Sequence, residues 1–153
     1  MSADATHLEV PVPQVDELFV AWWEATRDHQ FLVQRCQKCN GTQHYPRAIC
    51  SGCGSTDAMF FISATGIGTL YSFSEVFRPA HPSLRVPYVV ALVRIEEGPL
   101  VLTRIVGAAL KDLRCDQPVR LEWLSLDDGR ALPVFAIMSE YDESPHFRTQ
   151  NGG

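Results

Sequence analysis

Four of the chain's five cysteines lie within eighteen residues, in a pattern that could bind a metal ion. They form two Cys-x-x-Cys pairs separated by ten residues: Cys36, Cys39, Cys50 and Cys53. When two such pairs meet, they place four thiolates around one ion at Zn–S distances of about 2.3 Å. Four protein ligands complete a tetrahedral shell and leave no position for water, so the ion would be structural rather than catalytic. We therefore predict that these cysteines bind a structural Zn²⁺.

The residues that follow each pair suit this geometry. A metal-binding loop of this kind needs a residue with positive φ directly after its second cysteine, and that residue is normally glycine. Gly54 follows the second pair, and Asn40, the type that tolerates this conformation next best, follows the first. Iron bound by the same paired loops remains an alternative. A dithiol couple would leave one pair unexplained. His44, between the pairs, is a spare candidate ligand or, more simply, an exposed or packed hairpin residue.

No other group of residues predicts catalysis. Cys115 stands alone, and its neighbours Arg114 and Asp116 supply no base that could activate a thiol. We expect Cys115 to be a buried structural thiol. The five histidines are scattered, and the chain contains no Ser-His-Asp order, P-loop or Gly-x-Gly-x-x-Gly motif. Catalysis by this chain alone is not predicted.

An amphipathic helix is predicted before the cysteines, from about Asp16 to His29. Asp16 can cap its first turn, and apolar residues recur at helical spacing behind it. Two adjacent tryptophans on a short helix need cover. Either they pack on this chain's own ribbon and barrel, or they bind a partner protein, because tryptophan is enriched at interface hot spots. The candidate partner-binding residues are Phe19, Trp22 and Trp23.

Five strands are predicted after the cysteines from alternating or β-branched apolar runs. They span residues 66–77, 88–95, 100–106, 117–124 and 132–138. Turn residues at 97–99 and 127–129 join the second strand to the third and the fourth to the fifth. Residues 108–113 could form a short helix between the third and fourth strands, which is the element order of an OB-fold barrel.

The predicted fold class is therefore mainly β, with an N-terminal helix, a rubredoxin-like zinc ribbon and a five-stranded OB-fold barrel. The predicted divisions are an arm and amphipathic helix at 1–33, the zinc ribbon at 34–58, the OB-fold at 59–143 and a flexible tail at 144–153.

Composition limits the partners. The 153 residues are 46% hydrophobic, as in a globular protein, and no apolar run of about 18 residues predicts a membrane span. The first residues lack the basic and apolar regions of a secretory signal, so we expect a cytoplasmic, reducing environment in which structural disulfides are rare. The formal net charge of −5 disfavours a large phosphate-binding surface.

The order of these motifs resembles the zinc-ribbon plus OB-fold family of acyl-CoA-associated proteins. The sequence FVAWWEA leads into QRCQKC, then YPR, then CSGCG, and the strand sequences GIGTLYSFS and PYVVALVRIEEGPLVLTRIVG follow. The resemblance covers about residues 15–140 and departs at Asn40, where the family usually has glycine. It implies a small non-catalytic subunit that accompanies thiolases, related acyltransferases or thiolase-like aldolases acting on CoA thioesters. The resemblance also implies that some members are fused to or paired with hydratase-type domains, including in steroid side-chain breakdown. Its partner would carry the chemistry.

Three functions are compatible with these sequence features. The first is an accessory subunit of a thiolase-like enzyme, naturally as a 2:2 complex, that stabilises the complex and helps to form the substrate channel. The second is a stand-alone acyl-CoA-binding module, in which Arg78, Arg85 or Arg104 would bind the CoA phosphates. The favoured alternative for these arginines is that they are solvated or pair with acidic neighbours such as Glu75. The third is a single-stranded nucleic-acid binder. Residues 66–143 hold 8 basic and 11 acidic residues, a balance of −3 that argues against the third.

Overall fold

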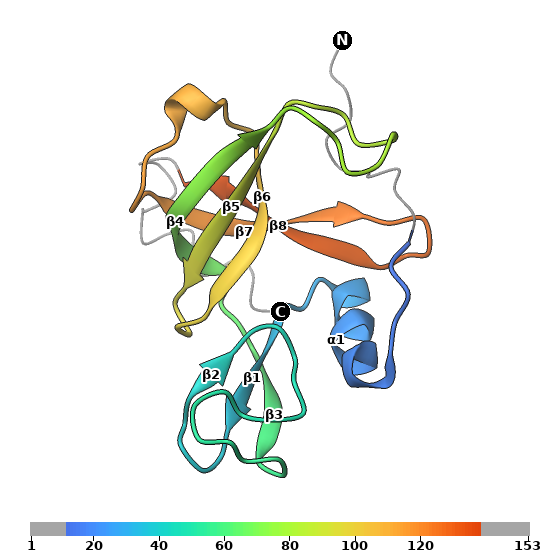
Figure 1. Ribbon diagram of the computed structural model, residues 1–153, viewed down its shortest axis with the longest axis vertical. Coiled ribbons are helices and arrows are strands. Elements are labelled where there is room, and N and C mark those ends of the chain that lie inside the picture. The colour runs from blue at the N-terminus through green and yellow to red at the C-terminus, as the bar shows by residue number, and fades with distance from the viewer. Residues whose placement is uncertain (1–11, 139–153) are drawn as a thin grey trace.

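The computed structural model describes residues 12–138 and consists of a short helical segment, a three-stranded sheet and a closed five-stranded barrel. The barrel and the three-stranded sheet lie at opposite ends of the molecule, and the helical segment lies beside their junction (Figure 1). Among the described residues, no helix is long and apolar enough to span a bilayer.

The predicted N-terminal helix is present but is α-helical only in its middle. Glu17–Phe19 and Thr26–Asp28 are 3-10 turns, and α1 spans Val20–Ala25 between them. Asp16 caps the segment as predicted, because its carboxylate accepts a 3.0 Å hydrogen bond from the backbone N–H of Leu18. His29 ends the segment with a φ of 54°.

The sheet that carries the cysteine loops has the order β2-β1-β3. The strands are β1 (Leu32–Cys36), β2 (Thr42–Gln43) and β3 (Met59–Ser63), and both neighbours pair with β1 in antiparallel fashion. The sheet therefore extends past residue 58, where the sequence places the end of the ribbon. The short, non-alternating run of β3 gives no periodicity that could assign it to this sheet.

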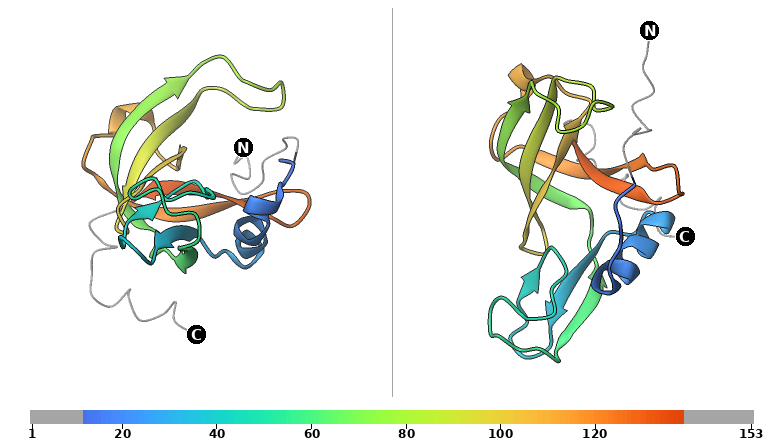
Figure 2. Two further views of the ribbon diagram at one scale, coloured as in Figure 1. Left: turned by 60° about the horizontal axis from the view of Figure 1, so that its bottom comes forward. Right: turned by 45° about the vertical axis from the view of Figure 1, so that its right-hand side comes forward.

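The barrel contains the five predicted strands, displaced by at most one residue at each end. They are β4 (Ile67–Val76), β5 (Tyr88–Ile95), β6 (Leu100–Val106), β7 (Pro118–Ser125) and β8 (Ala131–Ile137). Their order is β4-β5-β6-β8-β7, and β7 closes the barrel by pairing with β4. All pairs are antiparallel except β6 with β8. This is the OB-fold order, and Figure 2 shows the barrel from two further directions.

The helix predicted between the third and fourth strands is shorter than expected. Only Leu110–Asp112 forms a helical turn, of the 3-10 type, instead of the predicted residues 108–113. Ala109 before it and Leu113 after it are extended. Leu113 is buried under the barrel end, so the turn still delivers an apolar residue to the core.

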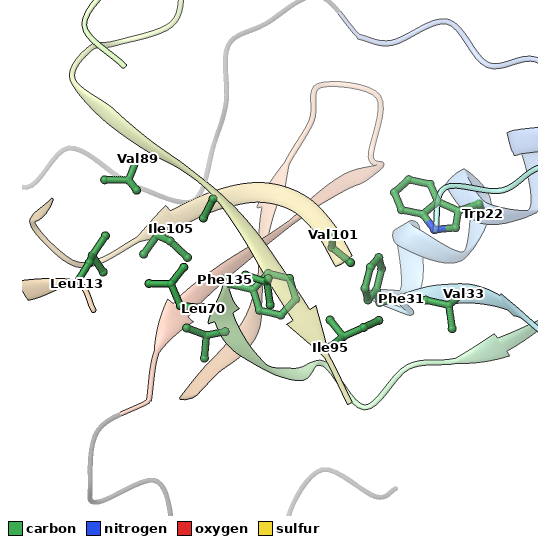
Figure 3. Packing of buried hydrophobic residues seen from close by; sticks show 13 residues of the cluster. Trp22, Phe31, Val33, Leu70, Val89, Ile95, Val101, Ile105, Leu113 and Phe135 are labelled. Atoms are coloured by element: carbon green, nitrogen blue, oxygen red, sulfur yellow. The ribbon is translucent and has the colours of Figure 1, made fainter. Parts of the chain in front are cut away.

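One hydrophobic core runs from the barrel into the helical segment and the cysteine-bearing sheet. Inward-facing residues of the barrel strands, such as Leu70, Val101 and Phe135, belong to the same cluster as Trp22, Phe31 and Val33 (Figure 3). Phe31 is only 2% exposed. Burying an aromatic side chain of this size stabilises a fold by about 2 kcal/mol or more. The two β units are therefore packed together rather than tethered by a loose linker.

Polar contacts add to this packing at the β5–β6 turn. The hydroxyl of Thr42, on β2, donates to the carbonyl oxygen of Glu97. The Glu97 carboxylate in turn accepts a 2.7 Å hydrogen bond from the backbone N–H of Thr65, which lies between β3 and β4. Gly98 follows in the turn with a φ of 109°, a conformation that favours glycine.

Candidate functional site

The structure brings the four predicted cysteine ligands together. The Sγ atoms of Cys36, Cys39, Cys50 and Cys53 all lie within 4.8 Å of one another. The distance from Cys36 Sγ to Cys53 Sγ is 3.7 Å, and that from Cys39 Sγ to Cys50 Sγ is 3.6 Å. Four sulfurs at about 2.3 Å from a tetrahedral zinc ion lie about 3.8 Å apart. The four side chains therefore fit such an ion.

The backbone of each cysteine loop has the predicted conformation. Asn40 and Gly54 have φ values of 57° and 74°, and their N–H groups donate 2.9 Å bonds to the carbonyl oxygens of Cys36 and Cys50. The N–H of Gly52 points at Cys50 Sγ from 3.4 Å. A side chain at position 41 would bring its Cβ to 3.3 Å from Cys39 Sγ, so glycine there leaves room for the sulfur.

The same loops favour ionised sulfur at Cys50. Hydrogen bonds from the backbone N–H groups of Cys53 and Gly52 lower the pKa of Cys50 from 9.0 to about 6. Thiolates, not thiols, are the metal-binding form of cysteine. Cys50 therefore favours the thiolate. The pKa of Cys39, by contrast, is raised to about 11, because the hydrogen bond from Gly41, which lowers it, is outweighed by its neighbour Cys50 and by burial.

Two buried glutamines, which the sequence did not single out as functional, hold the second cysteine loop. Gln43 Nε2 donates a 2.8 Å bond to Gln34 Oε1, which also accepts a 2.7 Å bond from the N–H of Arg47. Gln43 Oε1 accepts a 2.8 Å bond from the N–H of Ser51, next to Cys50. The side-chain amides replace backbone pairing that this irregular segment lacks. Their only sequence signal is the placement of Gln34 and Gln43 on strands beside the cysteines.

His44 packs in an aromatic cluster and is not grouped with the cysteines. Its ring centroid lies 4.2 Å from that of Tyr45, 5.3 Å from Phe31 and 5.8 Å from Trp22. Burial lowers the pKa of His44 from 6.5 to about 4, so the imidazole is neutral at pH 7. Its Nδ1 is buried and has no hydrogen-bond partner among the described residues. The simpler of the two predictions, a packed hairpin residue, is confirmed.

The two tryptophans pack within this chain, as the first interpretation of the helix expects. Trp22 is 5% exposed, and its indole Nε1 donates a 2.9 Å bond to the carbonyl oxygen of Leu32. Trp23 is partly buried and lies edge-on to Trp22, with 4.9 Å between the ring centroids. Neither ring projects freely into solvent.

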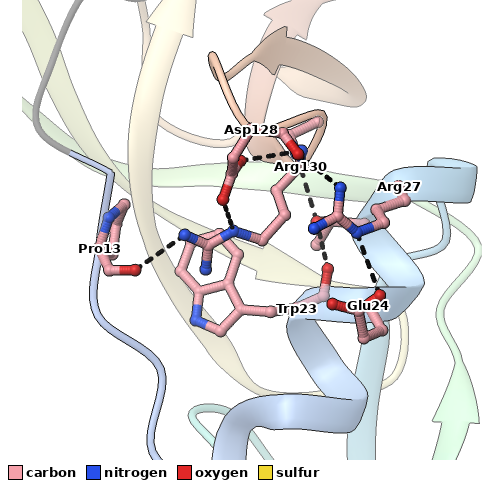
Figure 4. A network of polar contacts seen from close by, with 8 residues as sticks. Pro13, Trp23, Glu24, Arg27, Asp128 and Arg130 are labelled. Carbon is pink, nitrogen blue, oxygen red and sulfur yellow. Dashed lines mark hydrogen bonds and ion pairs between the residues drawn. The ribbon is translucent and has the colours of Figure 1, made fainter.

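Arg130, which the sequence analysis did not select, fixes the tryptophan-bearing segment to the barrel. Its guanidinium lies 4.6 Å above the Trp23 ring, and it bonds to the Asp128 carboxylate and, at 2.8 Å, to the Pro13 carbonyl (Figure 4). Arg27 donates a 2.6 Å bond to the Asp128 carbonyl from the other side. Arg130 is 5% exposed. The β7–β8 turn, the arm at Pro13 and α1 thus form one polar network.

A cavity of about 350 Å³ lies where the helical segment, the ribbon and the barrel meet. Part of its wall comes from β8 and from the arm at residues 13–16. We call it the aromatic cavity, after most of the other residues that line it: Phe19, Trp22, Trp23, His44, Tyr45, Val101 and Leu102. The three candidate partner-binding residues therefore share one cavity, although they do not protrude as a stripe.

The three candidate CoA-binding arginines do not form one site. Arg78 and Arg85 are exposed in the β4–β5 loop, and no ion pair joins either to another described residue. Arg104 lies on β6 with its guanidinium 4.5 Å above the Tyr88 ring, and burial lowers its pKa.

Cys115 is exposed, so the prediction of a buried structural thiol is wrong. It lies in the turn that enters β7, next to Asp116, whose φ is 66°. The turn directs residue 115 outward, while Leu113 and Val119 take the buried positions on either side.

Comparison with known proteins identifies both halves of the chain. Residues 23–58 match the model described as the ChsH2 rubredoxin-like zinc ribbon domain, and residues 62–124 match the ChsH2 C-terminal OB-fold domain. A solved structure described as the Ltp2-ChsH2(DUF35) aldolase is 36% identical in sequence to this chain, with a TM-score of 0.74. The match covers 82% of this chain and 98% of that one.

Two relatives match this chain over part of their own length. Over 134 residues the chain is 37% identical to a Thermomonospora curvata protein named probable enoyl-CoA hydratase alpha subunit, covering 88% of this chain and 42% of that protein. Over 101 residues it is 31% identical to a Methanocaldococcus jannaschii protein named DUF35 domain-containing scaffold protein, covering 64% of this chain and 71% of that protein. The chain thus spans less than half the length of the hydratase relative.

Proposed function

Because the chain belongs to the ChsH2 (DUF35) family of zinc-ribbon and OB-fold proteins, we propose that it is a non-catalytic accessory subunit of a thiolase-like enzyme acting on CoA thioesters. The observation that carries this proposal is the match to nearly the whole length of a chain in the Ltp2-ChsH2(DUF35) aldolase. The scaffold and alpha-subunit names of the relatives agree with a role beside another polypeptide.

The chemistry of the described residues supports a non-catalytic role. The four cysteines are the one group of His, Cys, Asp or Glu residues in this part of the chain that could hold a metal, and they would saturate a tetrahedral ion. Cys115 has no base beside it in sequence, and the one strongly perturbed histidine, His44, is packed against aromatic rings. The reacting groups would therefore come from the partner. The accessory chain would stabilise the complex and shape the channel, in a 2:2 assembly.

Co-expression tests the proposal. The tagged chain, produced in its own host with a thiolase-like protein encoded beside it, should elute as one complex in size-exclusion chromatography with light scattering. The expected mass is that of two copies of each chain, and removing this chain should reduce the partner's activity or solubility. A chain that remains alone, with the partner equally active without it, would contradict the proposal. Heat on titration of the isolated chain with acetyl-CoA would favour an acyl-CoA-binding module instead.

We further propose that the four cysteines hold one structural Zn²⁺. The fit of the sulfur separations and the positive φ of Asn40 and Gly54 in the two loops support this assignment. Elemental analysis should find one zinc per chain in the wild type and none in Cys36→Ser. The control Cys115→Ser should keep its zinc, because that exposed thiol lies outside the cluster. Iron in place of zinc, visible as a coloured sample, would overturn the assignment.

A further inference from the structure

The aromatic cavity is a preformed apolar recess that the proposed function does not yet explain. Its volume of about 350 Å³ falls within the range of binding pockets, about 300–1,000 Å³. Its walls come from segments far apart in the sequence, and Trp22 and Arg130 hold those segments in place through the bonds to Leu32 and Pro13. Because the recess is preformed, little conformational entropy is lost when a binding group fills it.

The rim of the cavity is apolar and exposed to solvent. Leu102 on β6 is 54% exposed and Tyr45 is 43% exposed, and the Tyr45 hydroxyl donates a 3.3 Å bond to the Leu102 carbonyl oxygen. Single exposed apolar residues are ordinary, but here two large ones adjoin each other beside an apolar recess. Interface hot spots have this arrangement, in which a buried anchor fills a pocket and surrounding contacts exclude water.

The charge of the lining argues against a phosphate-bearing ligand. Asp16 is the one charged residue among those that line the cavity, since His44 is neutral at pH 7, and the exposed Glu17 adjoins it in sequence. No lysine or arginine lines the cavity, whereas CoA phosphates need cations. A protein segment with a lysine or arginine next to a bulky apolar side chain would suit this site. The apolar side chain would fill the recess, and the cation would lie near Asp16. The two nearby arginines are already engaged: Arg130 bonds to Asp128 and to the Pro13 carbonyl and lies over Trp23, and Arg104 is stacked on Tyr88.

We infer that the aromatic cavity receives a bulky apolar side chain of the partner subunit, flanked by a basic residue. This inference rests on the proposed function and locates one anchor of the proposed complex. It also gives Phe19, Trp22 and Trp23 a shared role, as walls that receive an anchor rather than as anchors themselves.

Substitution at the rim tests the inference with the partner identified by co-expression. Leu102→Trp should occlude the cavity and Leu102→Glu should place a second acidic group at its mouth, both at an exposed position where the fold tolerates change. Each should weaken the dissociation constant for the purified partner at least about 30-fold. The matched control is Phe77→Glu, at a 71% exposed apolar residue that does not line the cavity, and it should alter the constant less than about threefold.

Three results would overturn the inference. If wild type and both Leu102 variants bind the partner equally, the cavity is not the anchor site, although the accessory function stands. If the wild type binds no partner at all, both proposals fail. If octanoyl-CoA saturably changes the tryptophan fluorescence of the isolated chain, and Leu102→Trp abolishes that change, the cavity takes an acyl group instead.

Discussion

At the scale of single residues, the second cysteine loop depends on two buried amides. The side-chain amides of Gln34 and Gln43 are hydrogen-bonded to each other. Gln34 also accepts a hydrogen bond from the backbone N–H of Arg47, and Gln43 accepts one from that of Ser51. A buried donor that loses its acceptor costs about 1–3 kcal/mol, more than the bond itself contributes. The position of Cys50 is therefore coupled to residues that never touch the metal.

We predict that Gln43→Met lowers the free energy of unfolding by about 2 kcal/mol, because methionine keeps the volume but leaves the Ser51 N–H unsatisfied. Zinc should also dissociate faster from this variant. Chemical denaturation and a chromogenic chelator would measure the two effects. Gln37→Met, at an exposed position in the first cysteine loop, is the control and should change neither. Equal behaviour of the two variants would contradict the prediction.

His44 makes stability depend on pH. Its pKa is about 4 in the folded chain and near 6.5 when unfolded, so in this interval the unfolded state binds the proton and the folded state does not. The stability contributed by neutral His44 is complete above pH 6.5 and is lost as the pH falls toward 4. The loss is at most about 3 kcal/mol, at about 1.4 kcal/mol for each pKa unit.

Comparison with His44→Phe isolates this contribution. Denaturation from pH 7 to pH 4.5 should destabilise the wild type by about 2 kcal/mol more than the variant. Phenylalanine fits the same aromatic cluster and cannot titrate. Zinc release at acid pH affects both proteins, so the difference between their slopes reports His44 alone. Parallel slopes would show that the imidazole is not held neutral by burial.

At the scale of elements, the helical segment keeps its place through contacts rather than through its own helical propensity. Six residues of α-helix flanked by 3-10 turns are too short to be stable alone. Trp22 packs in the core, and Arg130 joins the arm, Trp23 and the β7–β8 turn. The segment should therefore loosen when Arg130 is lost.

We predict that Arg130→Met destabilises the protein by about 2 kcal/mol and increases hydrogen exchange in residues 17–28 at least tenfold. Methionine can still pack on Trp23 but cannot bond to Asp128 or Pro13. Hydrogen exchange read by mass spectrometry would measure the change by segment. Arg94→Met serves as the control, because Arg94 also covers an aromatic ring, Tyr71, but is exposed. Unchanged exchange in residues 17–28 would refute the role of Arg130.

The sequence predicted elements whose signal is local. Strands β5 and β6 are β-branched, apolar runs in which buried residues alternate with more exposed ones, and their limits were predicted as observed. Asn40 and Gly54 predicted the cysteine loops because the required backbone conformation is itself local. By contrast, β3 pairs with a strand more than twenty residues earlier, and the aromatic cavity is lined from the arm, α1, the ribbon and the barrel. The apolar periodicity of the sequence carries no information about contacts between such distant segments.

At the scale of the whole molecule, the ribbon and the barrel share one core. Phe31 and Val33 lie at the start of the ribbon sheet yet belong to the cluster that contains Leu70 and Phe135 of the barrel. A ribbon of this size has too little core to fold without its metal. Loss of the metal should therefore remove Phe31 and Trp22 from the barrel's surface, and so weaken the barrel as well.

We predict a single calorimetric unfolding transition with zinc, and a decrease of about 10 °C or more in the barrel's melting temperature when a chelator removes the metal. Phe31→Ala should reproduce much of this decrease with zinc still bound, because Phe31 is a large buried residue of the core that the two units share. The matched control is Phe60→Ala on β3, where the ring is 38% exposed and lies outside the shared core. If chelation left the barrel transition unchanged, the two units would be energetically independent. In that case, binding of a partner to the ribbon could not change the stability of the barrel through the shared core.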